Sequence, residues 1–282
     1  MCAAINSSEL ISAELISSRR NPLVGRLRAL QQAKGRREQG LLLLEGTHLL
    51  QEVVRLGLHP EQLLATPAWI ERHGSLLAAL EGEVRLQPVA EPVLEAVAST
   101  DHPDGVVLTL DQACLPQPRA EPSFVLALDQ LQDPGNLGTL LRTALAAGVE
   151  QVWLAGGADP LQPKVLRASA GAALAMPLWR TVERSALTER LEQVRCRGLQ
   201  LLATEVGEAG GAQPYWQLDW RRPTVLLLGN EGAGLAPELA ALASHRITIP
   251  HSGAVESLNV AVAAGPLLLE RWRQQQERMP AN

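Results

Sequence analysis

The chain has 282 residues, of which 46% are hydrophobic and 20% charged, and its formal net charge is -5. This length and composition are typical of a folded globular protein with one or two domains. No stretch is apolar over a length that would span a membrane, and the first residues do not resemble a secretory leader. These features predict a cytoplasmic protein and exclude the membrane and secreted classes. The three cysteines lie far apart and lack CxxC spacing, so neither a disulfide framework nor a metal site is expected.

Basic residues are concentrated near the start of the chain. Residues 15–37 hold seven Arg and Lys side chains and no acidic one, whereas Glu and Asp dominate residues 61–111. A local basic stretch can neutralise phosphates even on an acidic chain. The alternative is a solvated helix face that binds nothing.

The first part of the chain reads as a small α/β domain. A tail is expected at residues 1–15, followed by a helix in which Leu23, Leu27 and Leu30 share one stripe. Strands are predicted at 41–44, 63–64, 84–86 and 106–110, and helices around 49–54, 75–80 and 92–97. The domain is expected to cover residues 16–112. A polar segment with three prolines then predicts a linker at 113–122.

Strand and helix patterns alternate through residues 123–275, the expected second domain. Strands are predicted at 124–128, 149–154, 177–179, 199–204, 223–228 and 246–249, and helices at 136–147, 163–170, 186–196, 237–242 and from Ser257 onward. Alternation of this kind predicts a parallel sheet with helices on both faces. Ligands bind such sheets at the carboxyl ends of the strands.

Three polar, glycine-bearing segments follow predicted strands at that edge. In the first, residues 133–142, Arg142 lies at the edge of a buried helical stripe, where it can reach an anionic ligand or a neighbouring subunit. The alternative for Arg142 is a surface ion pair. Asn136 opens the same helix, and a plain N-cap is its alternative role.

The second segment, residues 228–235, places three glycines directly after a strand. Glycine there allows backbone groups to approach a flat ligand closely. The segment lacks the Lys of a phosphate-binding loop and the spacing of a dinucleotide fingerprint. Glu231 within it is open to three interpretations: a general base, a clamp on an Asn or Arg side chain, or a solvated turn residue.

The third segment, residues 249–260, leads into the last helix, which Ser257 and Asn259 are expected to open. A simple N-cap is the alternative role for Ser257. The helix is too apolar for an exposed surface, so one face is expected against the sheet and another against a second subunit. No histidine pairing supports serine hydrolysis or metal chemistry.

With these three motifs in this order, the sequence resembles the SpoU or TrmH-like family of RNA ribose 2′-O-methyltransferases, members of the SPOUT superfamily. An additional match lies at residues 163–171. The first domain resembles the substrate-binding domain related to ribosomal protein L30e, through residues 18–23 and 44–50. The resemblance implies an α/β domain threaded into a trefoil knot, a homodimer, and S-adenosylmethionine bound in the knot.

The resemblance also implies roles for particular residues. The cofactor pocket would use Thr204, Gly229, Ile249 and Leu258. The catalytic group would consist of Asn136, Arg142, Glu231, Ser257 and Asn259. RNA backbone would be held by the basic stretch, through Arg19, Arg20, Arg36 and Arg37.

The function implied is S-adenosylmethionine-dependent methylation of a ribose 2′-hydroxyl, with ribosomal RNA favoured over transfer RNA. Because arginine almost never deprotonates, Arg142 is expected to bind an RNA phosphate and stabilise developing alkoxide charge, not to act as a free base. Two alternatives remain: a catalytically silent RNA-binding or ribosome-assembly factor of the same fold, and a related enzyme that methylates a base.

Overall fold

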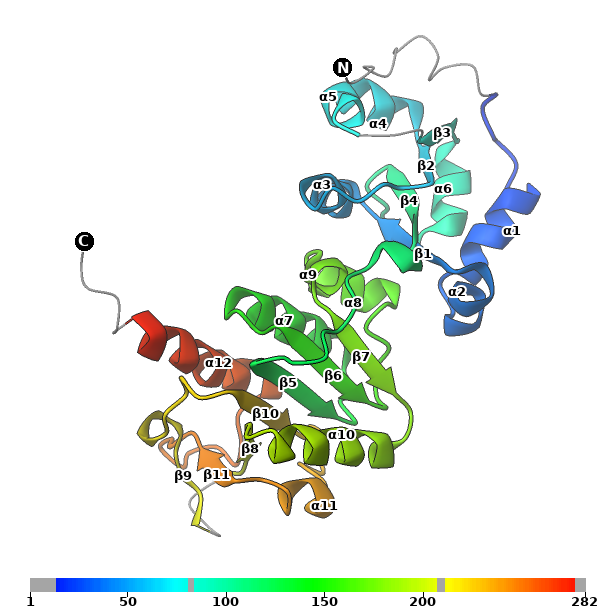
Figure 1. The fold of residues 1–282 in the computed structure, drawn as a ribbon. Coiled ribbons are helices and arrows are strands. Elements are labelled where there is room, and N and C mark those ends of the chain that lie inside the picture. The colour runs from blue at the N-terminus through cyan, green and yellow to red at the C-terminus, as the bar shows by residue number, and fades with distance from the viewer. Residues whose placement is uncertain (1–13, 81–83, 207–210, 277–282) are drawn as a thin grey trace. The chain divides into compact units, whose positions relative to one another are not determined.

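The computed structural model describes residues 14–80, 84–206 and 211–276. They form two compact units, and Figure 1 shows the elements of each. The first unit holds the described residues up to Leu115 together with Leu161–Leu174, and the second holds Pro116–Pro160 and the described residues from Ala175 onward. Of the predicted tail at 1–15, only Glu14 and Leu15 lie within the described residues.

The first unit contains a four-stranded sheet in the order β1-β4-β2-β3. β4 is antiparallel to both of its neighbours, whereas β2 and β3 are parallel. The strands are β1 (Leu41–Glu45), β2 (Gln62–Ala65), β3 (Arg85–Pro88) and β4 (Val106–Asp111). The helices before the second unit are α1 (Pro22–Ala29), α2 (Ala33–Gln39), α3 (Thr47–Arg55), α4 (Pro67–Arg72), α5 (Gly74–Ala78) and α6 (Glu91–Val97), and a short 3-10 turn, η1, follows at Gln112–Cys114.

Helix α1 forms where the leucine spacing predicts it. The side chain of Asn21 accepts a hydrogen bond from the Leu23 amide, which caps the helix, and Pro22 occupies its first turn. Leu27 then packs with Val93 of α6 and Val107 of β4 in one buried cluster. The sequence pattern missed α2 and α4, because both are short helices that show little of the apolar repeat used to find the others.

The second unit contains seven strands that pair in parallel throughout, in the order β7-β6-β5-β10-β8-β11-β9. The strands are β5 (Phe124–Asp129), β6 (Gln151–Ala155), β7 (Leu178–Thr181), β8 (Gln200–Thr204), β9 (Gln213–Pro214), β10 (Thr224–Leu228) and β11 (His245–Thr248). The helices of this unit are α7 (Pro134–Ala146), α10 (Arg184–Cys196), α11 (Pro237–Ala240) and α12 (Val260–Gln276), with a 3-10 turn, η3, at Tyr215–Gln217. Helix α8 (Pro163–Ala168) and all but the last residue of α9 (Ala172–Ala175) belong to the first unit. The predicted parallel sheet is confirmed.

Helices cover both faces of this sheet (Figure 1). On one face α10 inserts Leu187 and Leu191 among strand residues such as Val125 and Leu227. Since side chains alternate along a strand, the neighbouring buried residues Leu126 and Leu226 point to the opposite face. α7 and α12 lie on that face and pack against each other.

The strand order sets the path of the chain near its end. β11 lies beyond β8, whereas the following helix α12 packs against α7, which comes from β5. The chain therefore returns across the carboxyl ends of β8 and β10 through residues 249–259. The expected knot requires a crossing of this kind, and the crossing brings the third polar segment beside the other two.

One predicted boundary is wrong. The last helix begins at Val260, not at Ser257, and then continues through Pro266. Asn259 caps it, because its Oδ1 atom accepts from the amides of Ala261 and Val262 at 2.9 and 3.3 Å. None of the helices within the described ranges is long and apolar enough to cross a membrane.

Candidate active site

A cavity of about 440 Å³ opens at the carboxyl end of the second sheet. Its walls come from the ends of β8, β10 and β11, from the loop after β10, and from the start of α12. This volume lies in the usual range for small-molecule sites. The lining includes Thr204, Glu205, Leu228, Gly229, Glu231, Ile249, Ser257, Leu258, Asn259 and Leu267, and Asn136 borders it from α7.

Three side chains from the three polar segments meet beside this cavity. Asn259 Nδ2 donates to Asn136 Oδ1 at 2.9 Å. Asn136 Nδ2 in turn donates to Glu231 Oε1 at 3.3 Å. We call these three residues the Asn–Glu cluster. Residues 123 positions apart in the chain thus form one hydrogen-bonded unit, as the order of the motifs predicted.

Glu231 acts as a clamp in this arrangement. Its two carboxylate oxygens also accept from the backbone amides of Gln132 and Asp133, at 3.2 and 3.1 Å. Partial burial would raise the pKa of Glu231, but hydrogen bonds from its own amide, from these two amides and from Asn136 together lower the pKa below its ordinary value. A carboxylate held ionised by several donors is a poor proton acceptor. Of the three interpretations, the geometry favours the clamp.

The cap of α7 leaves the Asn136 side chain available. Asp133, not Asn136, caps α7: its Oδ1 accepts from the Asn136 amide at 2.7 Å. The Asn136 side chain is therefore free to point toward Glu231 and Asn259. The N-cap alternatives for Asn136 and Ser257 are both wrong, because Asp133 and Asn259 fill those positions.

The loop after β10 is rigidly folded against its own strand end. A Cβ atom at Gly229 would lie 2.1 Å from the backbone of Gly234 and Leu235, so only glycine fits. Asn230 holds the loop, because its Oδ1 accepts from the Gly232 and Ala233 amides and its Nδ2 donates to Gln130 O at 2.9 Å. Sequence reasoning missed Asn230 as a site residue. The signal was an asparagine, a residue suited to turns, directly after Gly229 and two positions before Gly232.

The predicted cofactor residues lie together. Thr204, Gly229, Ile249 and Leu258 all line the cavity, as does Ser257. The Thr204 hydroxyl donates to Leu227 O at 3.1 Å, which ties the end of β8 to β10. Arg142 is separate: it is exposed on α7, does not line the cavity, and makes no hydrogen bond or ion pair to the described part of the chain.

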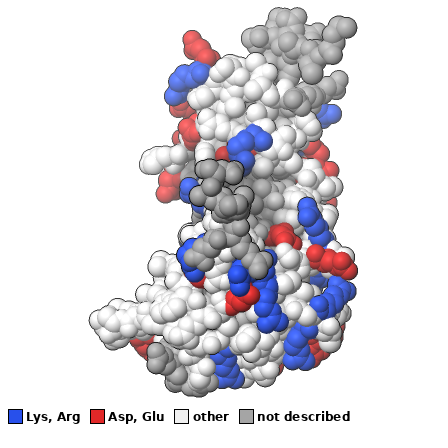
Figure 2. All heavy atoms as spheres, turned by 60° about the vertical axis from the view of Figure 1, so that its left-hand side comes forward, with Lys and Arg blue, Asp and Glu red and all other residues white. Residues whose placement is uncertain are grey.

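The four predicted RNA-binding arginines differ in accessibility. Arg20 and Arg37 are exposed. Arg19 is exposed but pairs with Glu95 at 2.9 Å. The predicted RNA-binding role of Arg36 is wrong. Arg36 is only 4% exposed, and its guanidinium donates to Leu30 O and Gln31 O, where it caps the end of α1. Arg36 therefore cannot present its charge to a phosphate. On the face shown in Figure 2, basic side chains are mixed with acidic ones.

Comparisons with known proteins fit this geometry. The SpoU rRNA Methylase family model matches residues 123–269, and the MRM3-like substrate binding domain model matches residues 21–108. The chain belongs to the SpoU rRNA methylase family. The prediction of an S-adenosylmethionine-dependent RNA 2′-O-methyltransferase is thereby confirmed, and the silent-factor alternative loses its support.

Similar proteins cover both units. An uncharacterized tRNA/rRNA methyltransferase of Synechocystis is 46% identical, over 92% of this chain and 94% of its own length. The 23S rRNA (guanosine(2553)-2′-O)-methyltransferase RlmP of Bacillus subtilis is 31% identical, over 90% of this chain and 97% of its own. The AdoMet-bound rRNA methyltransferase of Sinorhizobium meliloti shares 32% identity with a TM-score of 0.76, over 95% of this chain and 99% of that one. The predicted SPOUT fold is confirmed.

Proposed function

We propose that this methyltransferase acts on the ribose 2′-hydroxyl of ribosomal RNA, and that it does so as a homodimer in the cytoplasm. The observation that carries the proposal is the Asn–Glu cluster at the mouth of a cavity built for a small ligand. The relative from Bacillus subtilis that spans both units acts on 23S rRNA, which favours ribosomal RNA over transfer RNA. The proposed division is an RNA-binding domain at 16–112, a linker at 113–122 and a methyltransferase domain at 123–275.

The residues present fit S-adenosylmethionine. Gly229 lets the loop after β10 fold back on its strand end, because a Cβ atom there would meet the backbone of Gly234 and Leu235, and the folded loop forms one wall of the cavity. Leu228, Leu258 and Leu267 provide apolar walls. Glu205 adds a carboxylate, one oxygen of which pairs with Arg246 at 3.2 Å. When bound, the cofactor supplies an electrophilic methyl group on a sulfonium. Gly229, Ile249, Leu258 and Thr204 would hold it.

The chain's own residues would position the ribose and manage charge. Asn259 and Ser257 border the cavity, where a 2′-hydroxyl could accept and donate hydrogen bonds. Glu231 fixes Asn136, and Asn136 fixes Asn259, so the amide group nearest the substrate is held before the ribose arrives. Positioning of this kind is a large part of catalysis in group transfer.

Arg142 would act in the site of the partner subunit. It does not line the cavity of its own chain, yet it lies exposed on α7, which packs against α12. The outer face of α12 is apolar, with Val262, Leu269 and Trp272 exposed by 63, 46 and 49%. A contiguous apolar stripe of this kind is typical of a covered surface. Pairing through α7 and α12 would bury the stripe and bring Arg142 to the partner's RNA phosphate.

The first domain would hold the RNA backbone through Arg20 and Arg37, with Arg19 released from Glu95 on binding. Guanidinium groups bind phosphates well, because their planar fork matches the oxygens of the anion. Arg36 takes no part.

The test is methyl transfer in vitro from isotope-labelled S-adenosylmethionine to purified ribosomal RNA and transfer RNA. Digestion to nucleosides followed by mass spectrometry then separates ribose from base methylation. We expect label in one 2′-O-methylnucleoside of ribosomal RNA. Label in transfer RNA alone would correct the substrate, and label on a base would contradict the reaction.

A further inference from the structure

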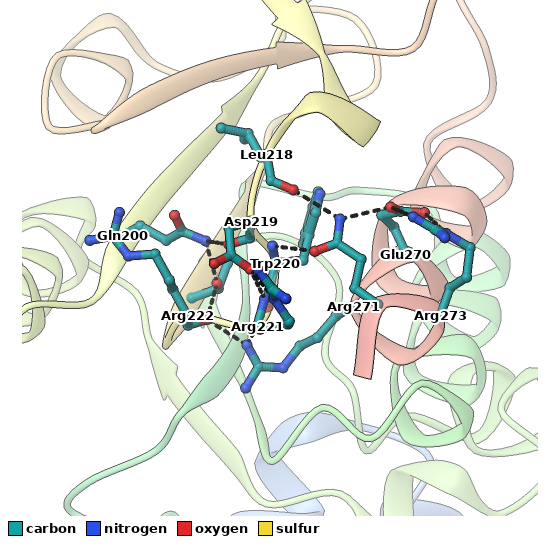
Figure 3. A network of polar contacts seen from close by, with 11 residues as sticks. Gln200, Leu218, Asp219, Trp220, Arg221, Arg222, Glu270, Arg271 and Arg273 are labelled. Atoms are coloured by element: carbon teal, nitrogen blue, oxygen red, sulfur yellow. Dashed lines mark hydrogen bonds and ion pairs between the residues drawn. The ribbon is translucent and has the colours of Figure 1, made fainter. Parts of the chain in front are cut away.

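A buried arginine lies at the opposite end of the second sheet from the cavity. Arg271 of α12 is 6% exposed, and its Nη1 atom donates to Trp220 O at 2.7 Å and to Arg222 O at 2.6 Å (Figure 3). Both carbonyls belong to the segment that enters β10. Burial lowers the pKa of Arg271, while the nearby Glu150 carboxylate opposes this shift.

The same guanidinium contacts the start of β5. Its central carbon lies 4.7 Å from the centre of the Phe124 ring, and its Nη2 atom donates to Ser123 Oγ at 3.4 Å. Ser123 is itself bonded through its amide and hydroxyl to Glu150, just before β6. One side chain on α12 therefore joins the entry of β10 to the entry of β5.

The three elements that Arg271 joins, α12, β5 and β10, carry the Asn–Glu cluster at their other ends. β5 leads to Asn136, β10 leads to Glu231, and α12 begins directly after Asn259. β5 and β10 are neighbours and pair in parallel along their lengths, so a shift of one against the other at the entry is transmitted to the carboxyl end. α12 spans roughly 16 Å from Val260 to Arg271 at the standard helical rise. It continues as one helix through Pro266, so Arg271 and the amides that Asn259 caps belong to the same element.

A second contact fixes the rotation of α12. Gln274, 9% exposed, accepts from the Trp220 amide and donates to Leu218 O, both at 2.9 Å. Its Nε2 also donates to Glu270 Oε1 within the helix, at 2.8 Å. Because Arg271 and Gln274 are three positions apart, they hold one face of the helix against residues 218–222. The face that carries Ala263 and Leu267 to the cavity is thereby set.

We propose that Arg271 is a positioning residue for methyl transfer: by holding α12, β5 and β10 together at one end of the sheet, it sets the alignment of Asn259, Asn136 and Glu231 at the other. The activity measurements that test this proposal rest on the proposed function. If Arg271 had a purely structural role, its substitution would lower stability without changing the rate of methyl transfer per folded molecule.

The test compares Arg271→Met, Arg271→Lys and the core control Leu191→Ala. Leu191 is fully buried on the sheet face opposite α12 and makes none of the hydrogen bonds of Arg271, so Leu191→Ala lowers stability through the hydrophobic core and leaves those hydrogen bonds in place. Well below all melting temperatures, we expect kcat to fall about tenfold for Arg271→Met, to recover in part for Arg271→Lys, and to stay near wild type for Leu191→Ala. Equal losses in kcat for Arg271→Met and Leu191→Ala would overturn the proposal.

A double-mutant cycle identifies the route. If Arg271 acts through Asn259, then Arg271→Met combined with Asn259→Ala should be no slower, within about twofold, than Asn259→Ala alone. Effects that multiply would overturn the proposal. Should Arg271→Met fail to fold, the cycle is run with Arg271→Lys.

A second readout needs no activity. Hydrogen exchange at the Ala261 and Val262 amides, which Asn259 caps, should be about tenfold faster in Arg271→Met than in Leu191→Ala. Unchanged protection there would overturn the proposal while leaving the proposed function intact. Absence of methylation by the wild-type protein would instead reject the proposed function, and the exchange measurement would still judge Arg271.

Discussion

The two ends of the second sheet carry polar networks of opposite character, although the same elements supply both. At the amino end, Arg271 and Gln274 are buried, and their partners are backbone groups together with the Ser123 hydroxyl and the Glu270 carboxylate. At the carboxyl end, Glu231 and Asn259 are exposed, and Asn136 is half-buried beside a cavity. We call the buried network at the amino end closed and the exposed network at the carboxyl end open. A closed network holds elements in place, whereas an open one keeps hydrogen-bonding capacity for a ligand. Substitutions at the open end should therefore change rate or affinity, and those at the closed end should also change stability.

The largest effect is expected at Arg142. Arg142→Ala should lower methyl transfer by about 100-fold or more, because the charge that stabilises the developing alkoxide is lost, while cofactor affinity and melting temperature stay unchanged. Single-turnover rates and calorimetric titration with S-adenosylmethionine measure these quantities.

Mixing variants tests where Arg142 acts. Heterodimers formed from Arg142→Ala and Asn259→Ala chains should recover up to about half of the wild-type activity per site pair if Arg142 serves the partner's cavity. Failure to recover any activity in verified heterodimers would place Arg142 in its own subunit's site.

Two glycines in the loop after β10, Gly229 and Gly232, allow a matched comparison of alanine substitutions at the open end. Gly229→Ala would force its Cβ into the backbone of Gly234 and Leu235, whereas a Cβ at Gly232 meets nothing closer than Asn230 Oδ1 at 3.6 Å. We expect the first to weaken cofactor binding by about 30-fold and the second by less than about threefold. Equal affinities for the two variants would show that the loop is not the wall of the cofactor site.

Glu231 should give a smaller loss of rate and a distinctive pH dependence. Glu231→Gln should slow methyl transfer about tenfold by loosening Asn136. Because the folded-state pKa of Glu231 is lowered, the carboxylate contributes stability above the ordinary Glu value of about 4.3, and that contribution is lost as pH falls through the lower folded-state pKa.

Thermal unfolding at a series of pH values measures this contribution. The difference in melting temperature between wild type and Glu231→Gln should be largest near pH 7 and should shrink below about pH 4.3. A difference that grows with acid would contradict the clamp.

The smallest effects are expected in the first unit, where exposed and buried arginines stand side by side. Neutralising Arg20 and Arg37 should weaken RNA binding by a few fold and reduce the salt slope of the affinity by about 2. Arg36→Ala should instead lower the melting temperature, because Leu30 O and Gln31 O lose their donor. Titrations at several salt concentrations separate the two. An unchanged slope for the double variant would remove these side chains from the RNA interface.

The sequence predicted most of the fold because its apolar runs have the right lengths. Strands such as Val225–Leu228 are continuous apolar runs, as expected for a parallel sheet covered on both faces. The Asn–Glu cluster was also within reach, since each member follows a strand that ends at the same edge.

What the sequence could not show depends on which neighbour satisfies each polar group. Asn136 and Asp133 are both good caps, and only the structure shows that Asp133 takes that position. Arg36 and Arg37 look alike in sequence, yet one side chain turns inward to two carbonyls. Arg271 gave no signal at all, because its partners, two backbone carbonyls and the Ser123 hydroxyl, lie far away in the chain.

Methylation of a ribose in ribosomal RNA is tested best in cells. The measurement maps 2′-O-methyl marks across total RNA from cells with and without the gene. We expect that one mark in ribosomal RNA disappears without the gene and returns with the wild-type protein but not with Arg142→Ala. An unchanged ribosomal RNA profile, with the lost mark found in transfer RNA or nowhere, would contradict it.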